Sequence, residues 1–175
     1  MDAGGDEGDH LRYCERRDLQ MAMREGTGRF GLRPVSAAWD ENCIHRVWFG
    51  RLDGAGSLHP LITEYLAGRR TDLSMLRSPA EEGETLSARI YQVVRAIPYG
   101  ETRTYGEVAA VAGTHPRVIG GALRRNPTPI IIPCHRVVGK KEIGGFTPDP
   151  AIKAELLNLE AGLIKKGRLN SNRFK

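Results

Sequence analysis

Clusters of apolar residues in the first half of the chain predict a β-hairpin followed by a helix. Residues 35–39 and 43–49 are rich in β-branched and aromatic side chains, and the polar run between them is typical of a turn. Residues 59–67 have the amphipathic pattern of a helix, and Gly68 favours a helix end. The polar segment 72–83 then predicts a link between two parts of the chain.

The second half of the chain shows the period of α-helices. Apolar residues recur at helical spacing between residues 86 and 97, and Pro98 ends that pattern. A final helix is predicted to start at Asp149 and Pro150 and to end near Gly162. No internal repeat is visible along the chain.

Two short helices with a tight turn between them are predicted in the middle of this half. The run 104–107, Thr-Tyr-Gly-Glu, is a capping box that opens the first helix, and Gly113 closes it. Thr114 is predicted to cap the second helix, which reaches Arg125. This arrangement is the helix-turn-helix pattern. Glycine costs about 1 kcal/mol in a helix relative to alanine, so Gly120 and its neighbour predict close approach of a DNA backbone or another helix.

Length and charge set further bounds on what the chain does. Its 175 residues suit one large domain or two small ones, and no apolar run is long enough to span a bilayer. Residues 98–175 hold 13 basic and 6 acidic residues, whereas the remainder holds 13 basic and 15 acidic ones. The charge therefore favours a polyanionic partner for the C-terminal part, although an ordinary solvated basic surface would have the same composition.

The N-terminal region offers little chemistry of its own. Residues 1–9 are acidic and glycine-rich, predict a flexible start, and lack the features of a signal peptide. The three cysteines form no CxxC pair, so a disulfide framework has little support. Cys14, Cys43, His10 and His45 have donor atoms for a metal, but their spacing matches no metal motif, and no metal site is predicted. An intracellular, reducing location, the cytoplasm, is expected.

One segment near the end of the chain carries the chemistry. The sequence Pro-Cys-His-Arg-Val at 133–137 follows three isoleucines, which predicts a buried segment that holds Cys134 in a fixed place. A thiolate is the reactive form of cysteine, and neighbouring imidazole or cationic groups lower its pKa and supply a base. Free cysteines are also commonly inert, buried hydrophobes. The Cys-His pair alone leaves both interpretations open.

The sequence around this segment resembles the active-site region of the O6-alkylguanine-DNA alkyltransferases. The resemblance covers residues 85–162 well and the N-terminal half weakly. The short connection at residues 114–117 resembles that of archaeal members. The shared features are Ile97 to Thr102, Thr104 to Gly106, Gly120 to Pro127, Pro129, Pro133 to Val138, Gly144 to Thr147, Lys153, Leu156-Leu157 and Glu160.

The resemblance implies an α+β fold with two domains. Residues 1–78 would form a small ribonuclease-H-like sheet-and-helix domain, and residues 79–175 a helical, winged-helix-like DNA-binding domain. The implied activity is direct-reversal DNA repair by a methylated-DNA–protein-cysteine methyltransferase. In a single turnover, a methyl or larger alkyl group moves irreversibly from O6 of a flipped guanine, or less readily from O4 of thymine, to Cys134. The resemblance implies double-stranded DNA as the partner, a monomer, no cofactor and no membrane.

The same resemblance assigns roles to five residues of the reaction. Cys134 would be the nucleophile, and His135 the base that takes the thiol proton through a water. Glu160 would orient the imidazole, and Tyr105 would protonate or hydrogen-bond the departing guanine near N3. Asn126 would tie the helix-turn-helix to the active-site backbone. Taken alone, Glu160 is a solvated helix-end carboxylate, Tyr105 a packing residue and Asn126 a turn residue.

Further residues would hold the base and the DNA. Phe146 and Thr147 stand where the family usually has Tyr and Ser, so the ring and a hydroxyl are kept, but the tyrosine hydroxyl is lost. Arg117 matches the arginine that enters the duplex in place of the extruded base, and taken alone it would bind phosphate or form a salt bridge. The other substrate-binding residues would be Leu123, Val137 and Lys153, and the other DNA-binding residues Val118, Gly120 and Arg124.

Three other classes of protein stay open from the sequence. An alkyltransferase-like sensor would bind lesions without repairing them, but such proteins lack the nucleophile that Cys134 supplies. A helix-turn-helix regulator, or the methyl-sensing half of one, would bind promoter DNA and would need a further domain. A cysteine hydrolase would turn over many times, whereas an alkyltransferase stops after one equivalent.

Overall fold

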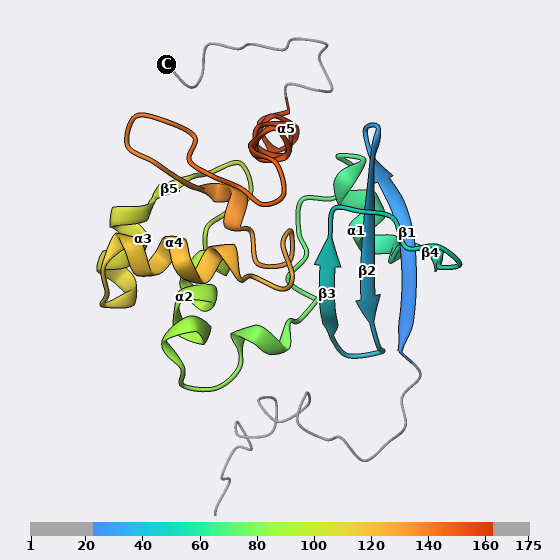
Figure 1. The fold of residues 1–175 in the computed structure, drawn as a ribbon, viewed down its shortest axis with the longest axis horizontal. Helices are drawn as coiled ribbons and strands as arrows, with labels where there is room; N and C mark the ends of the chain where they lie inside the picture. Colours follow the sequence, from blue (N-terminus) through green and yellow to red (C-terminus); the bar gives the residue numbers. More distant parts are fainter. Residues whose placement is uncertain (1–22, 163–175) are drawn as a thin grey trace, which may run out of the picture.

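The computed structural model describes residues 23–162 as a mixed α+β fold with two parts. A small β-sheet with one helix forms the first part, and a group of short helices forms the second (Figure 1). The segment that contains Cys134 runs between them, and the last helix lies at one end of both. None of the helices within residues 23–162 has the length and apolarity needed to span a bilayer.

The sheet has four strands in the order β3-β2-β1-β4. Strands β1, β2 and β3 are antiparallel, and the short β4 pairs in parallel with β1. The predicted hairpin is confirmed, and its turn is closed by Asp40, whose carboxylate accepts hydrogen bonds from the backbone N–H groups of Asn42 and Cys43. The strands are β1 (Arg24–Phe30), β2 (Arg33–Trp39), β3 (Ile44–Trp48) and β4 (Gly56–Ser57).

The predicted helices are present with small changes at their ends. His59 caps α1, and Gly68 follows it with a positive φ of 66°, as its position predicted. Both hydrogen bonds of the predicted capping box at Thr104 and Glu107 form. The helices are α1 (Pro60–Leu66), α2 (Leu86–Arg95), α3 (Tyr105–Ala112), α4 (Pro116–Arg124) and α5 (Pro150–Glu160), with 3-10 turns η2 (Pro79–Glu81) and η3 (Cys134–Arg136). Two short parallel strands, β5 (Arg103–Thr104) and β6 (Val137–Val138), pair beside η3.

One prediction about the helix-turn-helix is wrong, namely the residue that caps its second helix. The N-cap of α4 is His115, not Thr114, and its Nδ1 accepts a hydrogen bond from the backbone N–H of Arg117 at 3.2 Å. Pro116 occupies the first helical position, where its missing N–H costs nothing, and this fixes the helix start one residue later than predicted.

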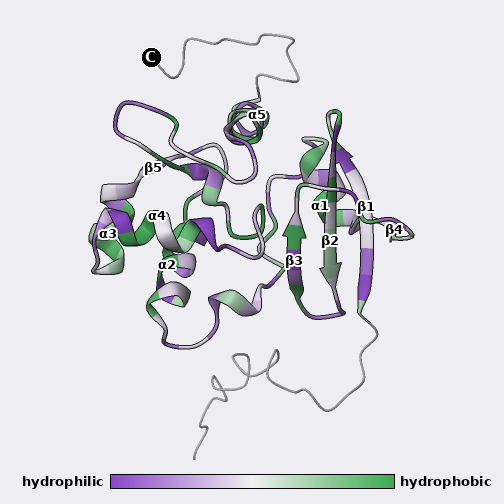
Figure 2. Ribbon diagram, in the orientation of Figure 1, coloured by the Kyte–Doolittle hydropathy of each residue, from purple (hydrophilic) through white to green (hydrophobic). Residues whose placement is uncertain are grey.

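Two hydrophobic cores meet at the segment before Cys134. Ile130 and Ile131 belong to the core of the sheet, α1 and α5, whereas Ile132 belongs to the core of α2, α3 and α4. Figure 2 shows apolar residues on β3 and on this segment. Ile130 has a φ of 79°, a rare value for a β-branched residue, and it is 2% exposed. Packing on both sides therefore fixes the position of the residues that follow.

The cysteines differ from the expectation drawn from their spacing. Cys43 is disulfide-bonded, although the spacing gave no support for a disulfide, whereas Cys134 is a free, buried thiol. A disulfide depends on the approach of two chain segments in the fold, which sequence spacing does not report. Within residues 23–162, no group of three or more His, Cys, Asp or Glu side chains is arranged to hold a metal ion. The predicted flexible start, residues 1–9, lies outside the described residues.

Candidate functional site

Cys134 begins the 3-10 turn η3 and lines a cleft of about 1300 Å³ between β3, α4 and the loop before α5. The residue is 7% exposed. Burial raises the pKa of its thiol above the ordinary value, against the opposing influence of the Asn126 side chain and the Lys153 charge. Cys134 is therefore a thiol near neutral pH, and a base must take its proton before it can attack.

His135 is completely buried and pairs with Glu160. Its Nε2 lies 2.6 Å from Glu160 Oε1, whereas its Nδ1 has no hydrogen-bond partner among residues 23–162. Because an ionised carboxylate only accepts hydrogen bonds, the proton of the neutral ring sits on Nε2 and the lone pair on Nδ1. Burial lowers the pKa of His135, so the ring is neutral near pH 7 and able to accept a proton.

The Glu160 carboxylate, at the last residue of α5, is surrounded by donors. Burial alone would raise its pKa, but the hydrogen bonds and charges of His135 and Arg136 lower it to about 2. Its Oε2 accepts from the backbone N–H of Gly100 at 2.8 Å, and its Oε1 accepts from the hydroxyl of Tyr65. This geometry fits the orienting role that the resemblance implied for Glu160.

Asn126 lies in the turn after α4 and contacts the segment that carries Cys134. Its Nδ2 donates to the carbonyl of Ile132 at 2.9 Å, and its Oδ1 accepts from the backbone N–H of Thr128 at 3.0 Å. The turn is thereby fixed to the backbone two residues before the thiol, in agreement with the tie that the resemblance implied.

Lys153 and Tyr105 also lie near the thiol of Cys134. Lys153 is completely buried, and its Nζ donates to the carbonyls of Val137 at 2.5 Å and Gly145 at 3.4 Å. Burial lowers its pKa to about 8, an effect that the nearby Cys134 opposes. The Nζ also lies 5.7 Å from the centre of the half-buried Tyr105 ring, which lines the cleft. A cation is thus held near both the thiol and the phenol.

The remaining predicted substrate residues divide into two groups. Leu123, Phe146 and Thr147 line the cleft, and the Phe146 ring packs edge-to-face on Phe49 of β3 at 5.8 Å between centres. Val137 is completely buried in the helical core, and it reaches the site through the carbonyl that accepts from Lys153.

The predicted DNA-binding residues lie on one helix at the rim of the cleft. Arg117, Gly120 and Arg124 of α4 line it, and Val118 is 41% exposed. A methyl group added at Gly120 would meet no atom of the described residues within 4 Å, so no neighbouring helix accounts for this glycine. Among the described residues that line the cleft, none is acidic and four are arginines: Arg46, Arg117, Arg124 and Arg125. This charge suits a polyanion.

Several residues that complete the site were not predicted from the sequence. Tyr65 comes from the first part of the chain, and nothing in its local pattern connects it with Glu160, 95 residues away. Arg136 was part of the quoted motif but had no role, although a buried arginine beside a Cys-His pair already indicates a carboxylate partner. Arg46 and Trp48 of β3, with a cation–π distance of 5.4 Å, form a cleft wall that the pattern of the strand did not indicate.

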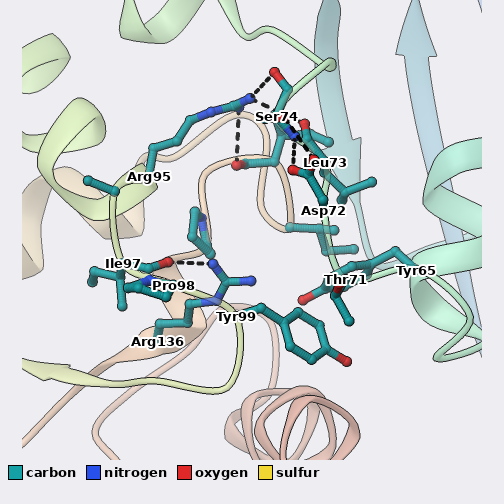
Figure 3. A pocket seen from close by; sticks show the side chains of 14 residues that line it. Tyr65, Thr71, Asp72, Leu73, Ser74, Arg95, Ile97, Pro98, Tyr99 and Arg136 are labelled. Carbon is teal, nitrogen blue, oxygen red and sulfur yellow. Dashed lines mark hydrogen bonds between the residues drawn. The ribbon is translucent and has the colours of Figure 1, made fainter.

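A second, smaller cavity of about 370 Å³ is lined in part by Ile131, Pro133 and Arg136 of the segment around Cys134. Tyr65, Tyr99 and Arg136 lie together on its wall, and Arg136 donates to the carbonyl of Ile97 at 2.6 Å (Figure 3). The cavity thus borders Tyr65 and Arg136, two of the donors to Glu160.

Comparison with known proteins adds to this geometry. Residues 85–162 match the family described as 6-O-methylguanine DNA methyltransferase, DNA binding domain. The methylated-DNA–protein-cysteine methyltransferase of Archaeoglobus fulgidus is 42% identical over 106 residues, 57% of this chain and 70% of the relative. That of Metallosphaera sedula is 38% identical over 59% of this chain and 66% of its own length. The crystal structure of Mycobacterium tuberculosis OGT in complex with DNA has a TM-score of 0.66 at 27% identity, over 79% of this chain and 93% of that one.

Proposed function

Because the chain belongs to the methylated-DNA–protein-cysteine methyltransferase family, we propose that it repairs DNA by transferring an alkyl group from O6 of guanine to Cys134. The observation that carries this proposal is the Cys134 thiol in an arginine-lined cleft, one residue from a neutral, carboxylate-bound His135. The activity of these relatives is direct reversal, in which the protein itself keeps the alkyl group. O4 of thymine would be a poorer substrate.

The reaction begins with loss of the thiol proton. His135 Nδ1 takes that proton through a water, and Glu160 stabilises the resulting imidazolium through Nε2. The thiolate of Cys134 then attacks the alkyl carbon in line with the C–O6 bond. An S–C bond forms, the C–O6 bond breaks, and the electron pair of that bond leaves with the guanine.

The leaving guanine anion needs a proton or a cation. Tyr105, which lines the cleft, donates its hydroxyl proton at guanine N3. The Lys153 ammonium over the Tyr105 ring stabilises the negative charge that this transfer leaves on the phenol. The S–C thioether has no route back to a free thiol in this site, so each molecule reacts once.

Duplex DNA must deliver the base to a thiol that is 7% exposed. A base inside the stack cannot reach such a thiol, so the guanine is flipped out at a cost of about a few kcal/mol. Arg117 fills the place of the extruded base, and Arg124 contacts phosphate. The exposed side chain of Val118 and the open backbone at Gly120 allow α4 to approach the duplex closely.

The proposal also includes a division of the fold into two domains. Residues 1–78 would form a ribonuclease-H-like domain and residues 79–175 a winged-helix-like domain. The separate core of α2, α3 and α4 supports this division, whereas Ile130, Ile131 and α5 pack into the core of the sheet. The protein acts as a cytoplasmic monomer without a cofactor, and size-exclusion chromatography with light scattering tests the monomer directly.

Mass spectrometry of the intact protein after incubation with duplex DNA containing O6-methylguanine tests the activity. We expect one added methyl group, mapped to the peptide that holds Cys134, and no further reaction. Cys134→Ala should abolish the transfer and keep DNA affinity within a few-fold. Repeated turnover would indicate a cysteine hydrolase, and lesion binding without a mass change would indicate a sensor.

A further inference from the structure

We propose that Tyr65, which lies outside the family-matched segment, is a positioning residue that holds Glu160 and thereby keeps the Nδ1 atom of His135 free to take a proton. The proposal rests on the proposed function, since it concerns the base of that reaction. According to this proposal, the first part of the chain contributes a side chain to the acid–base network of the site.

Tyr65 reaches Glu160 and His135 from α1. Its hydroxyl donates a hydrogen bond to Glu160 Oε1 and lies 3.3 Å from His135 Nε2. The residue is 1% exposed and belongs to the core of the sheet, so its ring has no freedom to move away. Burial and the neighbouring Glu160 charge raise the pKa of Tyr65 well above 10, so its hydroxyl keeps the proton that it donates.

Several donors share Glu160 Oε1, and this explains how the hydrogen bond from Tyr65 affects His135. That single oxygen accepts hydrogen bonds from Tyr65, His135 and Arg136. A carboxylate oxygen has two lone pairs, so each added donor reduces the negative charge that it offers to the others. Tyr65 therefore limits how strongly Glu160 attracts the imidazole, and its ring fixes where the carboxylate lies. An imidazole whose protonated form was stabilised too strongly would already carry a proton near neutral pH and could not take the proton of Cys134.

The charged and titratable groups around the pair come from several elements. Arg136 is on η3, and Lys153 and Glu160 are on α5. Tyr99 follows α2, and its ring packs edge-to-face on that of Tyr65 at 5.9 Å between centres. Tyr99 is a natural control, because its hydroxyl donates a hydrogen bond to the carbonyl of Leu159, at 3.5 Å, and not to Glu160 or His135.

The test compares Tyr65→Phe with Tyr99→Phe in the full chain. The rate of Cys134 alkylation by free O6-benzylguanine is measured from pH 5 to 9, so that DNA binding does not enter. In the unsubstituted protein, the rate should fall on the acid side below the ordinary histidine pKa. Tyr65→Phe should lower the rate at pH 7.5 by about tenfold, the worth of one hydrogen bond to a charged group, and move the acid limb upward by about half a pH unit or more. Tyr99→Phe should leave the rate at pH 7.5 and the position of the acid limb unchanged.

A second readout does not depend on activity. Nitrogen-15 spectra of the histidines, with the His135 signal identified by its absence in His135→Gln, should show a higher titration midpoint in Tyr65→Phe than in Tyr99→Phe. If both variants keep the pH profile and the His135 midpoint of the unsubstituted protein, Tyr65 is only a packing residue, and the proposal is wrong. If the unsubstituted protein transfers no alkyl group at any pH, the proposed function fails, while the His135 titration still decides the role of Tyr65.

Discussion

Arg136 and Glu160 form a two-point ion pair inside the protein, with Nε 3.0 Å from Oε2 and Nη2 2.9 Å from Oε1. Because burial keeps His135 neutral near pH 7, Arg136 is the permanent counter-charge of this carboxylate. The remaining nitrogen of the guanidinium, Nη1, donates to the carbonyl of Ile97. The charge of Glu160 is thus balanced without His135, which leaves that residue free to change its protonation state.

Removal of Arg136 should therefore destabilise the fold more than removal of a surface arginine. We expect Arg136→Met to lower the free energy of unfolding by about 3–5 kcal/mol, because it leaves a buried carboxylate without its cation. Arg33→Met is the matched control, since Arg33 pairs with Asp149 and Glu155 at the surface. Its cost should be about 0–1 kcal/mol. Urea unfolding of both variants measures the difference, and equal losses would contradict a buried ion pair.

The low pKa of Glu160 predicts an acid-dependent stability. The folded pKa of about 2 lies below the ordinary value of 4.5, so the unfolded chain binds a proton first as the pH falls. The contribution of Glu160 is complete above about pH 4.5 and is lost as the pH falls towards 2. Glu160→Gln should be less stable at pH 7, and its stability should change less than that of the unsubstituted protein between these values. Parallel stability curves for the two proteins would rule out this linkage.

Much of the second part of the fold follows from local sequence. The capping box at Thr104 and Glu107 and the left-handed Gly113 fix the ends of α3 through interactions within one turn. Asp149 and Pro150 define the start of α5 in the same way. Such signals are short-range, so a sequence carries them without knowledge of the tertiary structure.

The parts that could not be predicted depend on distant contacts. Strand β1 has two glycines and three charged residues, and its burial is confined to Gly26 and Phe30, so no alternation marks it. It is a strand because its backbone pairs with β2 from Arg24 opposite Trp39 to Phe30 opposite Arg33. The Tyr65 hydroxyl likewise meets Glu160 only after α1 and α5 pack into one core.

Lys153 should give the reaction an alkaline limit. Its pKa of about 8 means that the ammonium loses its proton above that pH in the folded protein. The charge that favours the Cys134 thiolate is then lost, and we expect the rate with free O6-benzylguanine to decline above about pH 8. Lys153→Met should react about tenfold more slowly at pH 7.5, the worth of one charge-assisted interaction, and should lack this alkaline limb. A limb that persists in Lys153→Met would belong to another group.

Arg117 and Arg124 should affect different steps although both lie on α4 and line the cleft. If Arg117 fills the gap left by the flipped base, it stabilises the extruded state and has no part in the reaction with a free base. We expect Arg117→Ala to slow alkylation by duplex DNA by about 100-fold, in keeping with a flipping cost of a few kcal/mol, and to leave O6-benzylguanine reactivity nearly unchanged.

Arg124→Ala is the matched control for this comparison, because a phosphate contact behaves differently from a residue inside the stack. Losing one phosphate contact weakens all DNA binding and lowers the salt dependence of affinity by about one ion, whatever the sequence or lesion. The second-order rate of Cys134 alkylation with each substrate, together with DNA affinity at several salt concentrations, separates the two roles. Equal losses on duplex and free base in Arg117→Ala would mean that Arg117 supports the thiol or the fold. In that case the salt slope of Arg124→Ala would still report whether α4 faces the DNA.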